Sequence, residues 1–127
     1  MKGITMLKRT LLAALLAVTV AAPAMAQDAK QNFQLVNRTG YELKAVFVSP
    51  SKVDSWGSDV MGQDTLDDSA SVAIKFHPTV QTCKWDLKVI YSIDNTSAVW
   101  SDVDLCTIEK ITIKYNKSTD TTSASFD

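Results

Sequence analysis

The sequence predicts an all-β protein, a β-sandwich of two antiparallel sheets with immunoglobulin-like architecture. Apolar side chains recur with a period of two, and no segment shows the 3.6-residue period of a helix. The strand-sized segments are short and separated by turn residues. The most regular of them also carries a tryptophan, Trp85, two residues after a cysteine. A small closed β-barrel is the alternative, because the same alternation occurs in barrels.

The N-terminal segment, residues 1–26, is predicted to be a signal peptide. Basic residues at positions 8 and 9 precede an apolar run over residues 11–22, and Ala24-Met25-Ala26 then has the small-x-small pattern of a cleavage site. The run ends at Pro23 and is too short for a membrane-spanning helix, which needs about 20 residues. We therefore expect a periplasmic or secreted protein with no membrane span after cleavage.

The remaining residues, 27–127, are expected to form a single β-sandwich domain of 101 residues. Removing residues 1–26 takes away three basic side chains and no acidic one, which leaves 10 basic and 14 acidic side chains and a net charge of −4. The lysines and the arginine are scattered singly along the chain. A mildly acidic domain without a basic cluster is not expected to bind nucleic acid.

The two cysteines, Cys83 and Cys106, predict one disulfide, because an even count in an exported chain of this size is most simply a cross-link. Closing a loop of this length stabilises the fold by about 3 kcal/mol in the chain-entropy model. A redox pair or a metal site is less well supported. The chain has no Cys-x-x-Cys spacing, and His77 is its single histidine.

The first two expected strands cover residues 32–37 and 41–49, with a turn at Gly40 between them. Their closeness in the chain predicts a hairpin. In the second strand the alternation predicts one face of Tyr41, Leu43, Ala45 and Phe47 and another of Glu42, Lys44, Val46 and Val48. This strand therefore begins with one hydrated face and ends apolar on both. Pro50 is expected to end it.

A long acidic connection follows over residues 52–71, and a third strand is expected at 71–76. The clearest strand is 83–93, which we expect to form the centre of the core and to pair as a hairpin with 97–105 across an Asp94-Asn95 turn. In that partner, Val99, Ser101, Val103 and Leu105 fall on one side. Cys106 is out of phase with this set, so either a bulge occurs at Leu105-Cys106 or the register is off by one.

The C-terminal part of the chain predicts one further strand at 110–115. Residues 116–127 are rich in Ser and Thr, and they form either a frayed tail or a weak edge strand through Thr122, Ala124 and Phe126.

A series of short motifs resembles a family of small secreted bacterial proteins of unknown function. The motifs are Asn37-x-Thr39-Gly40, Val48-Ser49-Pro50-Ser51, Trp56-Gly57, Cys83-x-Trp85-Asp86-Leu87 and Leu105-Cys106. The resemblance covers nearly all of the chain after the signal peptide, and it implies kinship without implying chemistry. Some relatives carry the name argininosuccinate lyase. That name does not suit this chain, because the genuine lyase is a much longer, largely helical cytoplasmic enzyme.

Catalytic residues are scarce, and we expect no enzymatic activity. A hydrolytic triad would have to use His77, which precedes a proline at the end of an expected strand. Asp86, Asp102 and Asp104 could form a pair of acid and base carboxylates. Because these positions alternate with core residues, we expect them to be hydrated surface charges.

Calcium is the most specific hypothesis for a bound ion, although the sequence does not require any cofactor. The chain contains acidic residues that could supply carboxylate oxygens at Asp54, Asp59, Asp64, Asp67, Asp68 and Asp94. Their spacing matches no EF-hand loop, and exposed aspartates in a loop usually serve solubility.

Two tryptophans suggest a binding surface for a protein or a glycan. Trp56 lies in the polar connection, and Trp100 shares its expected strand face with Asp102 and Asp104, so both are predicted to be partly exposed. Alternatively, Trp56 folds back to cap one end of the sandwich. The expected function is an exported, non-enzymatic accessory or interaction module. A calcium-dependent binding module is the second interpretation and a small hydrolase the third.

Overall fold

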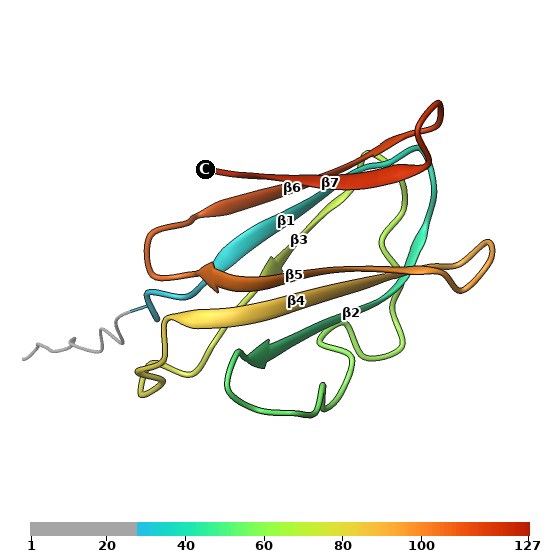
Figure 1. Cartoon of the computed structure of the whole chain (residues 1–127). Helices are drawn as coiled ribbons and strands as arrows, with labels where there is room; N and C mark the ends of the chain where they lie inside the picture. Colours follow the sequence, from blue (N-terminus) through green and yellow to red (C-terminus); the bar gives the residue numbers. More distant parts are fainter. Residues whose placement is uncertain (1–27) are drawn as a thin grey trace, which may run out of the picture.

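The computed structural model describes residues 28–127, which form two facing β-sheets (Figure 1). The predicted signal peptide and its cleavage site lie outside these residues. Within them, no helix is both long and apolar enough to cross a membrane. The strands are β1 (Phe33–Arg38), β2 (Leu43–Pro50), β3 (Ser71–Ile74), β4 (Lys84–Tyr91), β5 (Ser97–Asp104), β6 (Lys110–Asn116) and β7 (Thr121–Phe126).

One sheet has four strands in the order β3-β1-β6-β7, and the other has three in the order β2-β4-β5. The two sheets pack face to face, which confirms the predicted β-sandwich. One pair departs from the expected antiparallel pattern, because β1 and β6 run parallel. A parallel neighbour is available because the two strands are far apart in the chain, so no tight hairpin constrains their direction.

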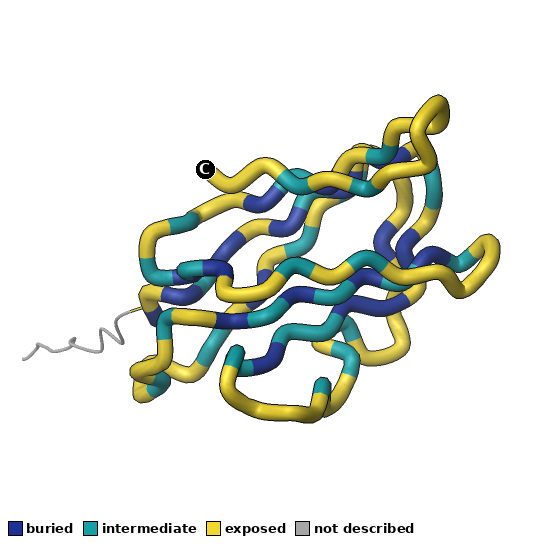
Figure 2. Tube along the Cα trace, in the orientation of Figure 1, coloured by how far each residue is buried: buried dark blue, intermediate teal, exposed yellow. Residues whose placement is uncertain are grey.

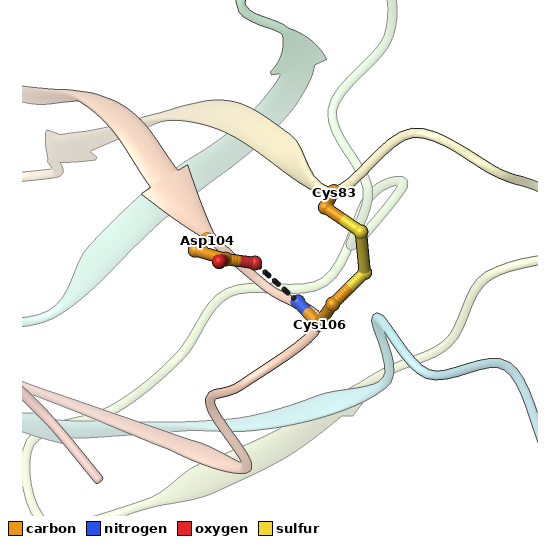
Figure 3. A group of neighbouring side chains, drawn as sticks. All are labelled: Cys83, Asp104 and Cys106. Atoms are coloured by element: carbon orange, nitrogen blue, oxygen red, sulfur yellow. Dashed lines mark hydrogen bonds between the residues drawn. A yellow bond between two sulfur atoms is a disulfide. The ribbon is translucent and has the colours of Figure 1, made fainter.

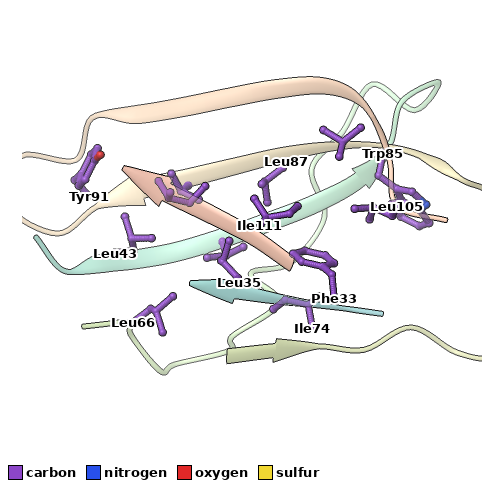
Figure 4. Close-up of a cluster of buried hydrophobic side chains, with 14 residues drawn as sticks. Phe33, Leu35, Leu43, Leu66, Ile74, Trp85, Leu87, Tyr91, Leu105 and Ile111 are labelled. Carbon is purple, nitrogen blue, oxygen red and sulfur yellow. The ribbon is translucent and has the colours of Figure 1, made fainter. Parts of the chain in front are cut away.

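The core lies between the two sheets and contains alternate residues of the strands. Figure 4 shows how Leu35 and Ile111 of the larger sheet face Leu43 and Leu87 of the smaller one. Both Leu35 and Ile111 are fully buried, and each such side chain stabilises the fold by about 1.5–3 kcal/mol. Buried positions alternate with exposed or intermediate ones along β1, β4 and β6, as the period of two predicts (Figure 2).

The expected hairpin of the first two strands is wrong, because β1 and β2 belong to different sheets. The chain crosses between the sheets at a corner organised by Asn37, which is fully buried. Its Nδ2 donates to the carbonyl oxygens of Tyr41 (2.8 Å) and Leu66 (2.9 Å), and its Oδ1 accepts from the hydroxyl and the amide of Thr39. These bonds satisfy the buried side-chain amide of Asn37. They also hold the chain where it crosses from one sheet to the other, in a segment whose sequence resembles a hairpin turn.

The predicted faces of residues 41–49 are also wrong beyond Leu43. Leu43 pairs with Tyr91 and Ala45 pairs with Ile90, so Lys44 is an extra residue in β2. This β-bulge shifts the alternation by one position. Val46 is therefore fully buried, whereas Phe47 lies on the outer side of the sheet together with Ala45.

A second bulge lies in β5, and Cys106 lies beyond it in the turn that follows the end of the strand at Asp104. Leu87 pairs with Trp100 and Trp85 pairs with Val103, so Ser101 and Asp102 together oppose a single residue of β4. Asp102 has a positive φ of 55°, and its amide donates to Asp86 Oδ1 at 3.0 Å. The bulge occurs four residues earlier than the predicted site at Leu105-Cys106. Before it the even-numbered residues point inward, and after it Val103 and Leu105 do.

The predicted hairpin of β4 and β5 is confirmed, although β4 ends at Tyr91 and not at residue 93. The third strand is similarly shorter than expected and ends at Ile74. At the C-terminus the edge-strand alternative is the one observed. The β7 strand pairs antiparallel with β6 from Asn116↔Thr121 to Ile111↔Phe126.

Cys83 and Cys106 form the predicted disulfide (Figure 3). It joins the residue before β4 to the second residue after β5, where the amide of Leu105 donates to the carbonyl of Cys83 at 2.9 Å. Asp104 Oδ1 accepts the amide of Cys106 at 3.1 Å. The cross-link therefore ties the two strand ends of one hairpin together.

Candidate binding surface

The outer face of the three-stranded sheet carries a row of side chains that the core does not use. Phe47 of β2 and Val99 of β5 both pair with Lys88 of the central strand β4. Because Leu87 and Val89 on either side are buried in the core, Lys88 and its two partners point to the opposite, solvent-facing side. Val99 is 50% exposed, although valine is an apolar residue.

Trp56 joins this row from the connection between β2 and β3. The Lys88 ammonium nitrogen lies 5.2 Å from the ring centroid of Phe47 and also 5.2 Å from that of Trp56. Both are cation–π contacts, each with a value of about 0.5–1 kcal/mol at an exposed site. The connection is held close by the Ser49 hydroxyl, which donates to the carbonyl oxygen of Ser55 at 2.7 Å. Trp56 is therefore half-buried against the outside of the sheet and does not cap an end of the sandwich.

We call this region the Trp56 surface; it comprises Phe47, Trp56, Lys88, Ile90 and Val99. None of its apolar members packs against the hydrophobic core between the sheets. Ile90 is the next outward residue of β4 after Lys88. The surface is thus an apolar and aromatic area with one positive charge at its centre.

Trp100, the other predicted member of a binding surface, is not part of it. The bulge at Ser101 and Asp102 places Trp100 on the inner side of β5, where it is half-buried and packs against the core. Asp102 is exposed, so the two residues do not share the face that simple alternation assigned to them. A patch containing both Trp56 and Trp100 is therefore not formed, because the two indoles contact opposite sides of the same sheet.

The carboxylates proposed for calcium mostly hold the loops that carry them. Asp59 Oδ1 accepts the amides of Val46 (3.1 Å) and Met61 (2.9 Å). Asp68 Oδ1 accepts the amide of Gly40 at 2.8 Å. Asp54, Asp64 and Asp67 are exposed. Asp59 thus covers part of the open edge of β2, which is a structural role for a loop aspartate.

No three of these carboxylates come together in the part of the chain that the structure describes. Asp94 lies on the β4–β5 turn, where its Oδ1 accepts the amide and the hydroxyl of Thr96. The one grouping of potential metal ligands within residues 28–127 is Cys83, Asp104 and Cys106. Its two sulfurs are joined in the disulfide and so offer no thiolate.

The residues considered for catalysis make local structural contacts. His77 is exposed, and its Nδ1 contacts the hydroxyl of Thr79 at 2.7 Å within a local turn. Asp86 accepts the Ser51 hydroxyl (2.8 Å) and the Asp102 amide, so it fastens the bulge. Asp104 accepts the amide beside the disulfide. The carboxylates of Asp86 and Asp104 therefore have local structural partners, and Asp102 is exposed.

Sequence reasoning found Trp56 but missed Phe47, Lys88 and Val99. A signal for Phe47 was present, because its strand reads as apolar on both faces near its end. One buried face is enough for a sheet in a two-layer sandwich, so a second apolar face marks residues available for other contacts.

Comparison with known proteins finds a structure with a similar fold but does not identify a family. No protein-family model and no curated protein matches the chain. The solved structures include a similar one, described as the NMR structure of a protein from Eubacterium rectale. It has a TM-score of 0.56 and 12% sequence identity, over 84% of this chain and 94% of that chain. At this identity the likeness shows a shared fold alone. The resemblance to small secreted bacterial proteins therefore stays a prediction.

Proposed function

We propose that this protein is an exported, non-enzymatic module that binds another protein through the Trp56 surface. The observation that carries the proposal is the row Phe47–Lys88–Val99, with Trp56 beside it, on a sheet face that the core leaves unused. Aromatic residues are enriched at protein interfaces, and a large indole near the centre of a patch is a frequent binding hot spot.

A protein partner is favoured over a glycan by the contacts of the aromatic rings. A sugar ring stacks on an open aromatic face, but the Lys88 ammonium already lies over both Phe47 and Trp56. Val99 and Ile90 extend the surface with aliphatic groups, which suit apolar side chains of a partner. We expect the partner to present an apolar area with a carboxylate that pairs with Lys88.

Export is supported by the predicted signal peptide and by the disulfide, since disulfides persist in oxidising compartments. Mass spectrometry of the protein from its native host tests this part. We expect a mature chain that begins at Gln27 and has both cysteines oxidised. An uncut chain with free thiols would contradict export.

Site-specific photocrosslinking in the native host tests the binding surface. A photoreactive residue at position 99 is expected to give a discrete protein adduct, whereas the same residue at the exposed position 123 of β7, on the opposite sheet, gives none. Trp56→Ala should lower the yield of the adduct about 30-fold, because losing a hot-spot indole costs about 2 kcal/mol of binding free energy. Equal adducts at both positions, or binding to a polysaccharide with no protein adduct at position 99, would overturn the proposal.

A further inference from the structure

A cleft lies at one open edge of the sandwich, away from the Trp56 surface. It is bounded by β5 from the smaller sheet and β7 from the larger one, and these strands are not paired with each other. Its volume is about 490 Å³. The lining residues that carry chemistry are Tyr41, Tyr91, Tyr115, Asp94, Asp120 and Thr122.

Three tyrosine rings form the wall of this cleft. They pack edge to face, with centroid distances of 6.2 Å for Tyr41–Tyr91, 5.7 Å for Tyr41–Tyr115 and 6.1 Å for Tyr91–Tyr115. The Tyr91 hydroxyl is 2.7 Å from the Thr122 hydroxyl, and the Tyr115 hydroxyl donates to Asp120 Oδ1 at 2.6 Å. Because each ring is held by its neighbours, the aromatic wall is organised before any ligand arrives.

The charge of the cleft is negative. Two of its lining residues, Asp94 and Asp120, are acidic. None of the described residues that line it is a lysine or an arginine. Hydrogen bonds from Thr96 hold the pKa of Asp94 below its ordinary value, which keeps this carboxylate ionised. Lys44 donates to the side chain of the neighbouring Asn95, which is not part of the lining.

We propose that this cleft binds an organic ammonium cation, with its alkyl groups on the tyrosine rings and its charge near Asp94 and Asp120. Aromatic faces attract cations through the ring quadrupole, and quaternary ammonium groups are common ligands of tyrosine-rich sites. Two carboxylates in a lining whose described residues include no lysine or arginine add Coulomb attraction that a neutral sugar cannot use and that repels an anion. The site is separate from the Trp56 surface, so either proposal can fail without the other.

Choline and its neutral isostere 3,3-dimethylbutan-1-ol provide the test, because they have nearly the same shape and differ in charge. In an amide-resolved NMR titration of the oxidised protein, choline should shift the signals of residues around Tyr91, Tyr115 and Asp120. It should bind about tenfold more tightly than the alcohol. Putrescine serves as a second cation, which shows whether a primary amine is also accepted.

Asp94→Asn and Asp120→Asn should each weaken choline binding by about threefold or more. Both changes keep the oxygen that accepts the local hydrogen bond, and asparagine tolerates the positive φ of 51° at position 120. Asp54→Asn is the matched control, since this exposed aspartate lies outside the cleft. The proposal is overturned if both cations leave the cleft signals unshifted, if the alcohol binds as tightly as choline, or if the control weakens binding equally.

Discussion

The two sheets have similar inner faces and very different outer faces. On the larger sheet, two outward rows pair Gln34 with Lys110 and Arg38 with Lys114, and the row between them pairs Val36 with Thr112, so this face is mostly polar and basic. On the smaller sheet, the corresponding row places Phe47 and Val99 around Lys88, beneath Trp56.

Both inner faces are needed for the fold, because together they enclose one core. The outer face of the larger sheet shows that hydrated side chains are sufficient on the solvent side. The apolar side chains on the outer face of the smaller sheet therefore have no role in closing the sandwich. We infer that they are there for contact with another molecule.

The disulfide has the largest expected effect, and it acts on the sheet that carries the Trp56 surface. Replacing Cys83 and Cys106 together by alanine should lower the free energy of unfolding by about 3 kcal/mol, because the unfolded chain regains the entropy of the closed loop. Equilibrium unfolding in urea measures this. The oxidised protein treated with a reductant is the control and should lose a similar amount; an unchanged midpoint in both would contradict the prediction.

The bulge in β5 comes next, since it turns Val99 outward and Trp100 inward. Asp102→Val should destabilise the protein by about 1 kcal/mol, because a β-branched residue is disfavoured at a φ of 55°. Asp102→Gly should cost nothing at this φ. The Asp102 side chain is exposed, so the pair isolates the backbone effect. Equal thermal unfolding midpoints for the two variants would show that the positive φ does not matter.

Removing one lysine from each outer face tests the comparison directly. Lys88→Met should lower the free energy of unfolding by about 1 kcal/mol, because the contacts of its ammonium with Phe47 and Trp56 are lost. Lys114→Met makes the same charge change on β6 of the polar face, and its effect should stay within about 0.5 kcal/mol. If the two variants unfold at the same urea concentration, the two faces are energetically alike.

The smallest effect concerns the open edge between the sheets. The hydrogen bond to Asp120 raises the pKa of Tyr115 from 10.0 to about 12. Folding favours the protonated phenol, so its stabilisation is complete below pH 10 and is lost as the pH rises toward 12. Absorbance at 295 nm should show this tyrosine ionising later than an ordinary one. Asp120→Gly removes the acceptor and tolerates the positive φ at this position, so it should bring the pKa of Tyr115 back toward 10; an unchanged titration curve would contradict the assignment.

The period of two predicted the fold class, and it holds along β1, β4 and β6 because these strands are unbroken. It assigned the wrong faces in β2 beyond Leu43 and in β5 before Val103, where one extra residue shifts the alternation. Nothing local in Lys44 marks a bulge. Asp102 is better suited to a positive φ than most residues, yet an aspartate in a strand is also an ordinary surface charge.

The candidate site was predicted only in part for the same reason. Trp56 is recognisable as an indole in a polar loop, but its contact with Lys88 joins a connection to a strand 32 positions further along the chain. Trp100 was assigned to the surface because the bulge beside it was unknown.

Alternating hydrophobicity and the cysteine count establish an all-β chain with one cross-link, because burial and covalent pairing depend on residue type alone. Which strands become neighbours is decided by the tertiary structure. Whether β1 pairs with β2 or with β3 and β6, and which side of the smaller sheet receives Phe47, depends on Asn37 at the corner and on two single-residue bulges. These features arise from hydrogen bonds between distant segments, and a local pattern carries no record of them.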